Sequence, residues 1–255
     1  MSGVLDLFRL DGKVAVVTGA SSGLGAGFAV ALAQAGADIV VAARRPDQLE
    51  QVAERVRAEG REAHVVEVDI SDPEACSRVA QESIDGFGRL DVLVNNAGIG
   101  TAVPALRETP EQFLAVVNVN LAGSYWMAQA AARVMRPGSS IVNISSVLAL
   151  IKSYAPQAAY AATKAGLLGL TRDLSQQWSG RRGIRVNALA PGYFESELTD
   201  TIPRDILNDF IGHTSTLGRL GHQQELDAAV VFLASPASSY VTGATLAVDG
   251  GMSGH

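Results

Sequence analysis

The chemistry of this chain is indicated first by a tyrosine and a lysine, Tyr160 and Lys164, in the stretch AAYAATKAGLLGL. Residues four apart on a helix share one face, so both side chains can point into the same cleft. A neighbouring ammonium favours the phenolate and lowers the pKa of a phenol from about 10 towards neutral pH. The pair therefore predicts a proton donor or acceptor for a carbonyl or an alcohol. The alternative is an exposed Tyr–Lys pair on an amphipathic helix.

Two serines, Ser145 and Ser146, end the stretch SIVNISS (140–146), which has the composition of a buried strand. Ligands of parallel sheets bind outside the carboxyl ends of the strands, and this is where the two hydroxyls are expected. One of them can hold the substrate oxygen that Tyr160 protonates. The alternative is that both serines only cap the end of the strand.

A glycine-rich turn, TGASSGLG (18–25), follows the apolar run KVAVVTGA (13–20) and precedes a predicted helix over 23–35. Glycines allow the backbone to turn sharply and to approach a pyrophosphate, whose charge the N-terminus of the helix stabilises. A bare glycine pattern is weak evidence, but its place after the first strand of an alternating pattern favours nucleotide binding.

The end of the second predicted strand (37–44) indicates which nucleotide binds. NAD-binding turns carry a carboxylate there for the ribose 2′-hydroxyl, whereas this chain has Ala42, Ala43, Arg44 and Arg45. An arginine can hold a 2′-phosphate through two hydrogen bonds, so we expect NADP(H), with Arg44 as the ligand. The alternative is that both arginines are solvated surface charges.

Short β-branched runs alternate with longer amphipathic stretches along the whole chain, which predicts parallel strands joined by right-handed helical crossovers. We therefore expect an α/β fold: one doubly wound, Rossmann-type domain over residues 1–255, with a mostly parallel seven-stranded sheet covered by helices on both faces. A pair of helices is expected between Glu111 and Met135. The predicted strands are 13–20, 37–44, 63–70, 91–98, 140–146, 184–192 and 245–251.

Composition excludes several classes of function. The net charge of −6 and the absence of a basic run argue against nucleic acid as a partner. Cys76, the single cysteine, and four scattered histidines predict neither a disulfide nor a metal site. No apolar run is long enough to span a membrane, and the N-terminus is too polar for a signal peptide. We expect a cytoplasmic protein that acts on a small molecule.

The motifs in their order resemble the short-chain dehydrogenase/reductase family, in its shorter branch. The resemblance covers nearly the whole chain, from GKVAVVTGASSGLG through NNAG, the SS and Y-x-x-x-K pair, and NALAPG to YVTGATLAVDGG. It implies that Tyr160 is the general acid/base, that Lys164 lowers its pKa and holds the nicotinamide ribose, that Ser146 orients the substrate oxygen, and that Asn120 positions a proton-relaying water. It also implies cofactor contacts at Gly19, Ser21, Ser22, Gly23, Leu24, Gly25, Arg44, Asp69, Ile70, Asn95, Asn96, Ala97, Gly98, Tyr160, Lys164, Pro191, Gly192, Phe194 and Ser196.

The sequence departs from the family pattern at two places. Ser146 precedes Tyr160 by one residue more than is usual, so Ser145 is the alternative for its role. Ser22 stands where many NADP(H)-preferring members carry a basic residue, which weakens the expectation of NADP(H). In NVNLAG, Asn118 is the alternative to Asn120.

The substrate is expected under a lid over 193–217, whose Ile202, Ile206, Leu207, Phe210 and Ile211 recur at helical spacing. Arg204 is its one basic residue, which argues against a strongly anionic substrate. Tyr154 and His213 are further candidates for substrate contact. The closest subgroups are 3-oxoacyl thioester reductases and sugar or sugar-acid dehydrogenases.

Two alternative functions fit this sequence less well. A non-catalytic nucleotide sensor has little need of the full set of active-site residues, and an epimerase of the longer branch needs a further substrate domain.

The family also implies a homotetramer. It is built on the helix of Tyr160 with its small-residue face (Ala161, Ala165, Leu168, Gly169), on the neighbouring helix and on the C-terminal strand. Trp126 and Trp178 fall in these two helices.

Overall fold

The computed structural model describes residues 3–195 and 204–254 and confirms the predicted α/β fold. Its seven strands form one sheet in the order β3-β2-β1-β4-β5-β6-β7, and every neighbouring pair is parallel. Each strand lies within a stretch predicted from its apolar, β-branched run. The strands are β1 (Val14–Thr18), β2 (Asp38–Ala43), β3 (Ala63–Glu67), β4 (Val92–Asn95), β5 (Ser140–Ile144), β6 (Arg185–Pro191) and β7 (Thr245–Val248).

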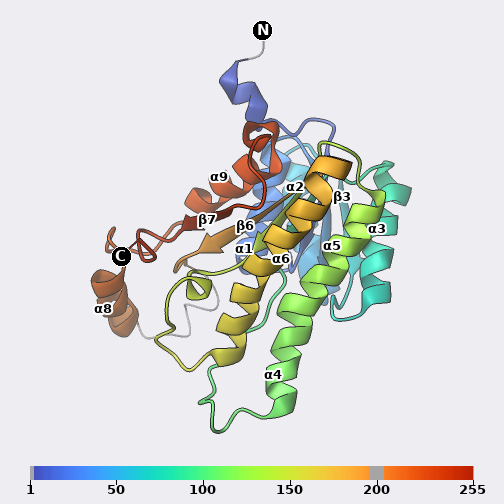
Figure 1. Ribbon diagram of the computed structural model, residues 1–255. Helices are drawn as coiled ribbons and strands as arrows, with labels where there is room; N and C mark the ends of the chain where they lie inside the picture. Colours follow the sequence, from blue (N-terminus) through green and yellow to red (C-terminus); the bar gives the residue numbers. More distant parts are fainter. Residues whose placement is uncertain (1–2, 196–203, 255) are drawn as a thin grey trace.

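Helices cover both faces of the sheet, and each layer encloses its own apolar core (Figure 1). Side chains alternate along β1, so Ala15 and Val17 join one core while Val14 and Val16 join the other. The first core is closed by α1 (Gly23–Gln34), α2 (Pro46–Ala58) and α9 (Gln223–Ala234). The second is closed by α3 (Pro73–Phe87), α5 (Ser124–Val134) and α6 (Ala158–Arg182).

The smaller elements are η1 (Val4–Phe8), α4 (Pro110–Val117), η2 (Asn118–Gly123), η3 (Val147–Ala149), α8 (Arg204–Thr214) and η4 (Pro236–Ser238). Figure 1 shows η1 at the top of the molecule, α4 at the bottom and α8 at the left.

Local signals set the helix ends. The Asp72 carboxylate accepts a hydrogen bond from the Glu74 N–H at 2.8 Å, Pro73 occupies the first turn, and Gly88 ends α3 with a φ of +73°. Asp72 is therefore the N-cap of α3.

The expected helical pair between Glu111 and Met135 differs from the structure in one respect. The π-helical segment η2 joins α4 to α5, so the backbone stays helical throughout. The Ser124 hydroxyl donates to the Asn120 carbonyl at 2.8 Å inside this segment. A π turn shifts the helical register by one residue and often marks a functional site. Here it carries Asn120.

The strand order reverses between β1 and β4, which start connections on opposite sides of the sheet. Such a switch point leaves a crevice outside the carboxyl ends of the strands. Thr18 ends β1, Asn95 ends β4 and Ile144 ends β5 at this carboxyl edge. The glycine turn, the NNAG turn and the two serines therefore meet there.

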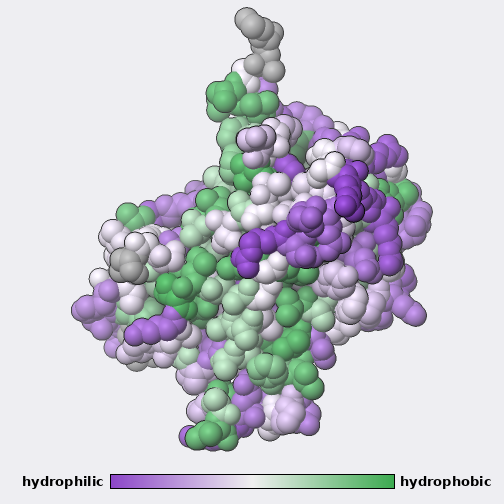
Figure 2. All heavy atoms as spheres, in the orientation of Figure 1, coloured by the Kyte–Doolittle hydropathy of each residue, from purple (hydrophilic) through white to green (hydrophobic). Residues whose placement is uncertain are grey.

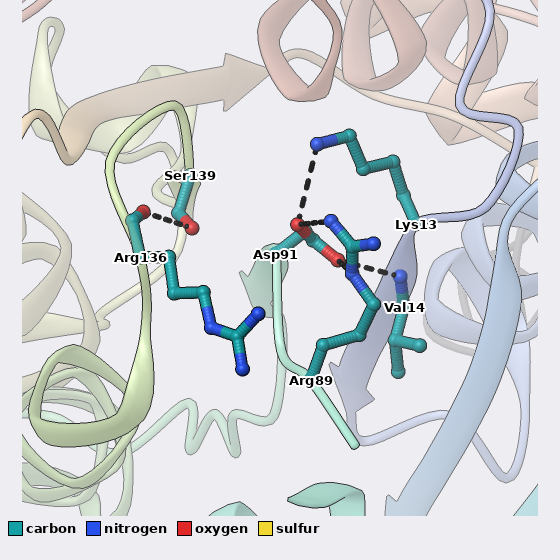
Figure 3. A network of polar contacts seen from close by, with 6 residues as sticks. All are labelled: Lys13, Val14, Arg89, Asp91, Arg136 and Ser139. Carbon is teal, nitrogen blue, oxygen red and sulfur yellow. Dashed lines mark hydrogen bonds and ion pairs between the residues drawn. The ribbon is translucent and has the colours of Figure 1, made fainter. Parts of the chain in front are cut away.

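Charges tie the strands together at the opposite, amino edge (Figure 3). Asp91, just before β4, accepts two hydrogen bonds of 2.7 Å from the Arg89 guanidinium, one of 3.0 Å from the Val14 N–H and one of 3.3 Å from Lys13 Nζ. Burial alone would raise the pKa of Asp91, but the hydrogen bonds from Arg89 and Val14 and the charge of Lys13 together hold it below its ordinary value. The carboxylate thus joins β1 to β4 as an ion.

We expect Asp91→Ala to lower the free energy of unfolding by about 3 kcal/mol, because it leaves Arg89 and Lys13 without their partner. A carboxylate whose folded pKa is depressed stabilises the fold above its unfolded pKa of about 4 and loses this effect as pH falls through the folded pKa. The difference between wild type and Asp91→Asn in urea denaturation should therefore shrink below about pH 4.

Asp11→Asn is the matched control. Asp11 makes the same two-bond contact with Arg9, at 2.8 and 2.6 Å, but on the exposed surface. Its effect should be much smaller than that of Asp91→Asn. Equal effects at the two positions would show that burial of the Asp91 network does not matter.

Candidate active site

The glycine turn after β1 is held against the NNAG turn after β4. Gly19 has a φ of +64°, and a Cβ there would lie 2.7 Å from the Ala97 Cα, so only glycine fits. Asn96 Nδ2 donates to the Thr18 and Gly19 carbonyls at 3.0 and 3.2 Å. The Thr18 hydroxyl accepts from the Asn96 and Ala97 N–H groups. The two predicted turns thus form one rigid unit.

The first turn of α1 opens onto this unit and suits a pyrophosphate. Gly23 begins the helix, and the first N–H groups of a helix have no intrahelical acceptor. A Cβ on Gly25 would lie 2.4 Å from the Gly19 carbonyl oxygen, which shows how closely the backbones approach. The predicted cradle of Gly19, Gly23 and Gly25 therefore fits the diphosphate of a dinucleotide.

The structure separates the two arginines after β2. Arg45 reaches the glycine turn: its Nη2 donates to the Ser21 hydroxyl at 3.0 Å and to the Ser22 hydroxyl at 2.9 Å. Arg44 is exposed, and its charge acts on Asp69. The sequence predicted Arg44 as the 2′-phosphate ligand, and the contact of Arg45 with both serines is the feature that it missed.

The predicted adenine contacts follow β3. Asp69 accepts two hydrogen bonds from Ser71, 2.9 Å from its N–H and 2.8 Å from its hydroxyl. These bonds hold the pKa of Asp69 below its ordinary value. Ile70 is buried against Gly123, where a Cβ would meet the Ile70 carbonyl at 2.8 Å. Asn95 is also buried, and its amide donates to Asn143 Oδ1, so its role is in the core.

Tyr160 and Ser146 come together at the carboxyl edge. The Ser146 hydroxyl lies near enough to the phenol to lower its pKa, and it accepts a hydrogen bond from the Leu148 N–H at 3.1 Å. Ser145 faces the other way and donates to the Lys164 carbonyl at 2.8 Å. Of the two serines, Ser146 is the one beside the phenol, as predicted.

Lys164 is buried one turn beyond Tyr160. Its Nζ donates to the Ile144 carbonyl at the end of β5, at 2.8 Å, and lies 5.6 Å from the centre of the Tyr160 ring. Burial lowers the pKa of Lys164 to about 8. The side chain therefore remains mostly protonated at neutral pH.

The pKa of Tyr160 shifts in the direction opposite to the one predicted. Burial raises it, the hydrogen bond with Ser146 lowers it, and neighbouring Tyr193 raises it further, so the net shift is upward. Lys164 is not among the causes of this shift; its Nζ lies 5.6 Å from the ring centre and bonds the Ile144 carbonyl. In this state Tyr160 keeps its proton at neutral pH.

Asn120 lies fully buried in the π-helical segment, whereas its alternative, Asn118, is exposed. Its amide joins three parts of the site: Oδ1 accepts from the Ile99 N–H at 2.8 Å, and Nδ2 donates to the Ile99 carbonyl at 2.8 Å and to the Thr163 hydroxyl at 3.2 Å. Asn120 therefore fastens the loop after Gly98 to the helix of Tyr160. A Cβ on Gly98 would lie 3.4 Å from Lys164 Nζ, so this loop borders the lysine.

The predicted nicotinamide contacts follow β6. A Cβ on Gly192 would lie 2.7 Å from the Asp249 Cα, which requires glycine there. Phe194 is buried and pairs with Gly221 in an isolated bridge, so it supports the loop from inside. Pro191 ends β6, and Ser196 lies outside the described residues.

The predicted lid over 193–217 contains α8, and residues 196–203 of it, including Ile202, lie outside the described residues. Leu207 and Ile211 are buried, and the Phe210 ring contacts Tyr154 and Tyr193. His213 is exposed and contacts the Asp209 carbonyl. Sequence reasoning missed Tyr193 and Met252, which pack with Tyr160. Their signal was position alone, directly after PG and GG.

Two further absences apply to the described residues. Over 3–195 and 204–254, histidine, cysteine and carboxylate side chains form no group of three that could hold a metal ion. None of the helices described there is long and apolar enough to cross a bilayer.

The arrangement thus pairs a dinucleotide cradle with a proton-transfer site. Gly19, Gly25 and Arg45 fit the phosphates of a dinucleotide at one end of the crevice. A serine hydroxyl, a phenol and a lysine meet at the other end, which can hold and protonate a carbonyl oxygen.

Comparison with known proteins agrees with this geometry. A family model described as enoyl-(acyl carrier protein) reductase matches residues 19–253. The chain is 42% identical over 254 residues to an uncharacterized oxidoreductase of Mycobacterium tuberculosis, with 98% of this chain and 95% of the relative covered. It is 35% identical over 246 residues to the 3-oxoacyl-[acyl-carrier-protein] reductase of Thermotoga maritima, with 96% and 99% covered.

Comparison with solved structures gives the same result. A gluconate 5-dehydrogenase from Burkholderia cenocepacia, solved in complex with NADP and tartrate, superposes with a TM-score of 0.92 at 38% identity, covering 99% of this chain and 100% of that chain. Fold, motifs and relatives agree, and the chain belongs to the short-chain dehydrogenase/reductase family.

Proposed function

We propose that this chain reversibly reduces a ketone to a secondary alcohol with NADP(H), with Tyr160 as the general acid/base. The observation that carries the proposal is the meeting of Ser146, Tyr160 and Lys164 at the carboxyl edge, beside the dinucleotide cradle. A nucleotide-sensing protein on this fold has no need of a phenol bonded to a serine next to a buried lysine. The relatives named as reductases and dehydrogenases support the same class.

Each residue has a distinct part in this mechanism. A bound nicotinamide supplies or accepts the hydride at the carbonyl carbon. Ser146 donates a hydrogen bond to the substrate oxygen, and Tyr160, which keeps its proton at neutral pH, gives that proton to the same oxygen. We propose that Lys164, whose positive charge lies 5.6 Å from the centre of the Tyr160 ring, faces the phenolate that forms only during turnover. Asn120 holds the Gly98–Ile99 loop against the helix of Tyr160 and so positions both.

The raised pKa of Tyr160 favours the reductive direction near neutral pH, because the proton donor is then fully loaded. Alcohol oxidation needs the phenolate and is expected to speed up as pH rises. We also propose that the described part of the predicted lid, Tyr193 and α8, covers the substrate, since α8 packs Phe210 onto Tyr193 beside Tyr160.

Arg45 supports NADP(H) as the preferred cofactor. The family's usual basic residue is absent at Ser22, but the Arg45 guanidinium bonds the Ser22 hydroxyl at 2.9 Å and brings a positive charge to the same place. Arg44 adds a second charge at the end of β2. We propose that both arginines hold the 2′-phosphate, and the NADP bound to the Burkholderia relative supports this cofactor.

A groove on the outer helices supports self-association. It encloses about 490 Å³ between η2–α5 and α6 and is lined by Leu121, Tyr125, Trp126, Gly166, Gly169 and Leu170. Figure 2 shows hydrophobic residues gathered over the part of this face where α5 and α6 run. The expected small-residue face is shifted: Leu168 is buried, and Gly166 and Gly169 line the groove. Trp178 packs on the core. We propose that α5 and α6 of two copies pack here about a twofold axis, as in a homotetramer.

Tyr160→Phe should abolish ketone reduction while leaving the Kd for NADPH within about twofold, because it removes the proton donor and little else. Loss of NADPH absorbance measures the turnover, and energy transfer from tryptophan to the reduced nicotinamide measures binding. Tyr240→Phe is the matched control, since Tyr240 is fully exposed and belongs to none of the site's contacts described above. Turnover of Tyr160→Phe at the wild-type rate would refute the mechanism.

The wild type should bind NADPH at least about tenfold more tightly than NADH, a difference of about 1.4 kcal/mol. Arg45→Ala should remove most of this preference by weakening NADPH alone, because NADH has no 2′-phosphate for the arginine to hold. Measuring Arg44→Ala in the same assay shows how much of the preference for NADPH each arginine contributes. If Arg45→Ala weakened both nucleotides equally, Arg45 would only shape the glycine turn.

Gly169→Glu should reduce the molar mass in light scattering from a multiple of 26.6 kDa to that of a smaller species. A Cβ at Gly169 has Arg172 Nη2 as its nearest neighbour, at 4.0 Å, so the single chain tolerates the change while the groove gains a charge. Gly180→Glu, at an exposed position of the same helix, is the control and should leave the mass unchanged. A wild-type mass of 26.6 kDa at micromolar concentration would contradict self-association.

A further inference from the structure

An apolar cluster packs around the catalytic tyrosine. Val147, Leu148 and Met252 are buried in it, whereas Ile151, Tyr160, Tyr193 and Phe210 are only partly buried. The partly buried members keep surface that faces outwards. We call Ile151, Tyr193, Phe210 and Met252 the apolar wall. Its residues come from four segments of the chain that meet beside Tyr160.

Phe210 is the central residue of the apolar wall because its ring brings together three segments of the chain: its own, that of Tyr154 and that of Tyr193. Its ring centre lies 5.2 Å from that of Tyr193, with the two planes at 70°, and 5.1 Å from that of Tyr154, with the planes at 49°. These are favourable edge-to-face and tilted contacts. Tyr154 is 82% exposed, so the Phe210 ring spans from the rim towards the interior.

Backbone hydrogen bonds fix both ends of the apolar wall. The Asp249 carboxylate accepts from the Gly251 and Ser253 N–H groups, both at 2.9 Å, and so fixes the turn that carries Met252. The Gly250 carbonyl accepts from the Ser215 hydroxyl and the Leu217 N–H, both at 3.0 Å, just beyond α8. These bonds therefore fix the positions of Met252 and of α8, which carries Phe210, relative to each other in the absence of substrate.

The groups on the other side of Tyr160 are polar. A Cβ built on Gly100 would lie 3.3 Å from Tyr160 Cδ2 and 4.0 Å from Gln157 Nε2, so both side chains border the same space. Ser146 bonds the phenol, and Lys164 lies over its ring. The site thus has a polar side, which suits the reacting carbonyl oxygen, and an apolar side, which suits the substituents on the carbonyl carbon.

A polyhydroxylated acid fits this division poorly. Its hydroxyl groups would lose water against Ile151 and Phe210, at a cost unless each finds a hydrogen bond. Of the nearby cations, Arg219 is already paired: it donates two hydrogen bonds to the Glu225 carboxylate, at 2.8 and 2.6 Å. Lys152, next to Ile151, is exposed.

We propose that the substrate is a ketone that carries an apolar chain or ring, such as a 3-oxoacyl thioester, and that Phe210 is the residue that selects it over polyhydroxylated acids. This assignment rests on the proposed reductase function and narrows its substrate. The carbonyl oxygen meets Ser146 and Tyr160 while the apolar group lies against Ile151, Tyr193 and Phe210, which the buried Met252 supports from behind. Binding energy comes from contact with the Phe210 ring, so shortening that side chain weakens these ketones alone.

The test compares the N-acetylcysteamine thioester of 3-oxohexanoic acid with 5-oxogluconate as substrates, with NADPH. The wild type should show a kcat/KM at least about tenfold higher for the thioester. Phe210→Ala should lower the thioester kcat/KM about 10- to 100-fold, mainly through KM, and leave the 5-oxogluconate value within about twofold. Phe210→Leu, which keeps apolar bulk, should retain most of the activity.

Phe8→Ala is the matched control. Phe8 is also half-buried and contacts one aromatic ring, Phe232 at 6.2 Å, but at the amino edge. It should change neither substrate's kinetics. An unchanged Kd for NADPH shows that each variant is folded. A higher kcat/KM for 5-oxogluconate, or an equal loss for both substrates in Phe210→Ala, would overturn the assignment.

Binding separates this assignment from the proposed function. The Kd of each ketone for the NADPH complex is measured in wild type and in Phe210→Ala, each also carrying Tyr160→Phe so that no turnover is needed. Thioester binding that weakens in Phe210→Ala supports the apolar wall even if wild-type turnover is absent, which would refute only the reductase. Thioester binding that does not depend on Phe210 refutes the apolar wall, whatever the turnover.

Discussion

The hydrogen bond from Lys164 Nζ to the Ile144 carbonyl is the contact on which the site depends. An ammonium is costly to bury, and burial accordingly lowers its pKa to about 8. A second bond, from the Ser145 hydroxyl to the Lys164 carbonyl, joins the same two elements, so α6 is fastened to the end of β5 at both the side chain and the backbone of one residue. This attachment of α6 to β5 fixes the position of Tyr160, which lies one helical turn before Lys164. Ser146 follows the same strand end, which fixes its position too.

Much of this could be predicted because it is local. Each strand is a short β-branched run, and the pairing of Tyr160 with Lys164 needs only the helical period. The parallel sheet follows from the alternation of strands and helices, and the meeting of the glycine turn with the serines follows from the sheet, since all carboxyl ends share one edge. The helix cap at Asp72 is equally local, as its carboxylate bonds an N–H two residues away.

The rest depends on contacts that sequence spacing does not contain. Ser145 and Ser146 differ by one position, and only the end of β5 decides which of them faces the phenol. The direction of Arg45 is set by the Ser21 and Ser22 hydroxyls, 24 and 23 residues away. The upward pKa shift of Tyr160 arises from burial by segments far along the chain, which a pairwise argument from Lys164 leaves out.

The two edges of the sheet show how the same physics serves stability at one end and reactivity at the other. At the amino edge Asp91 is surrounded by Arg89, Val14 and Lys13, and its charge is balanced where it lies. At the carboxyl edge an ammonium has three donors, and in the described part of the chain one of Lys164's bonds a carbonyl. A buried cation that is incompletely paired is costly for folding, but it keeps hydrogen-bonding capacity for groups that bind there. The balanced ion thus lies at the amino edge of the sheet, and the incompletely paired one lies at the carboxyl edge, beside the crevice that the switch point leaves.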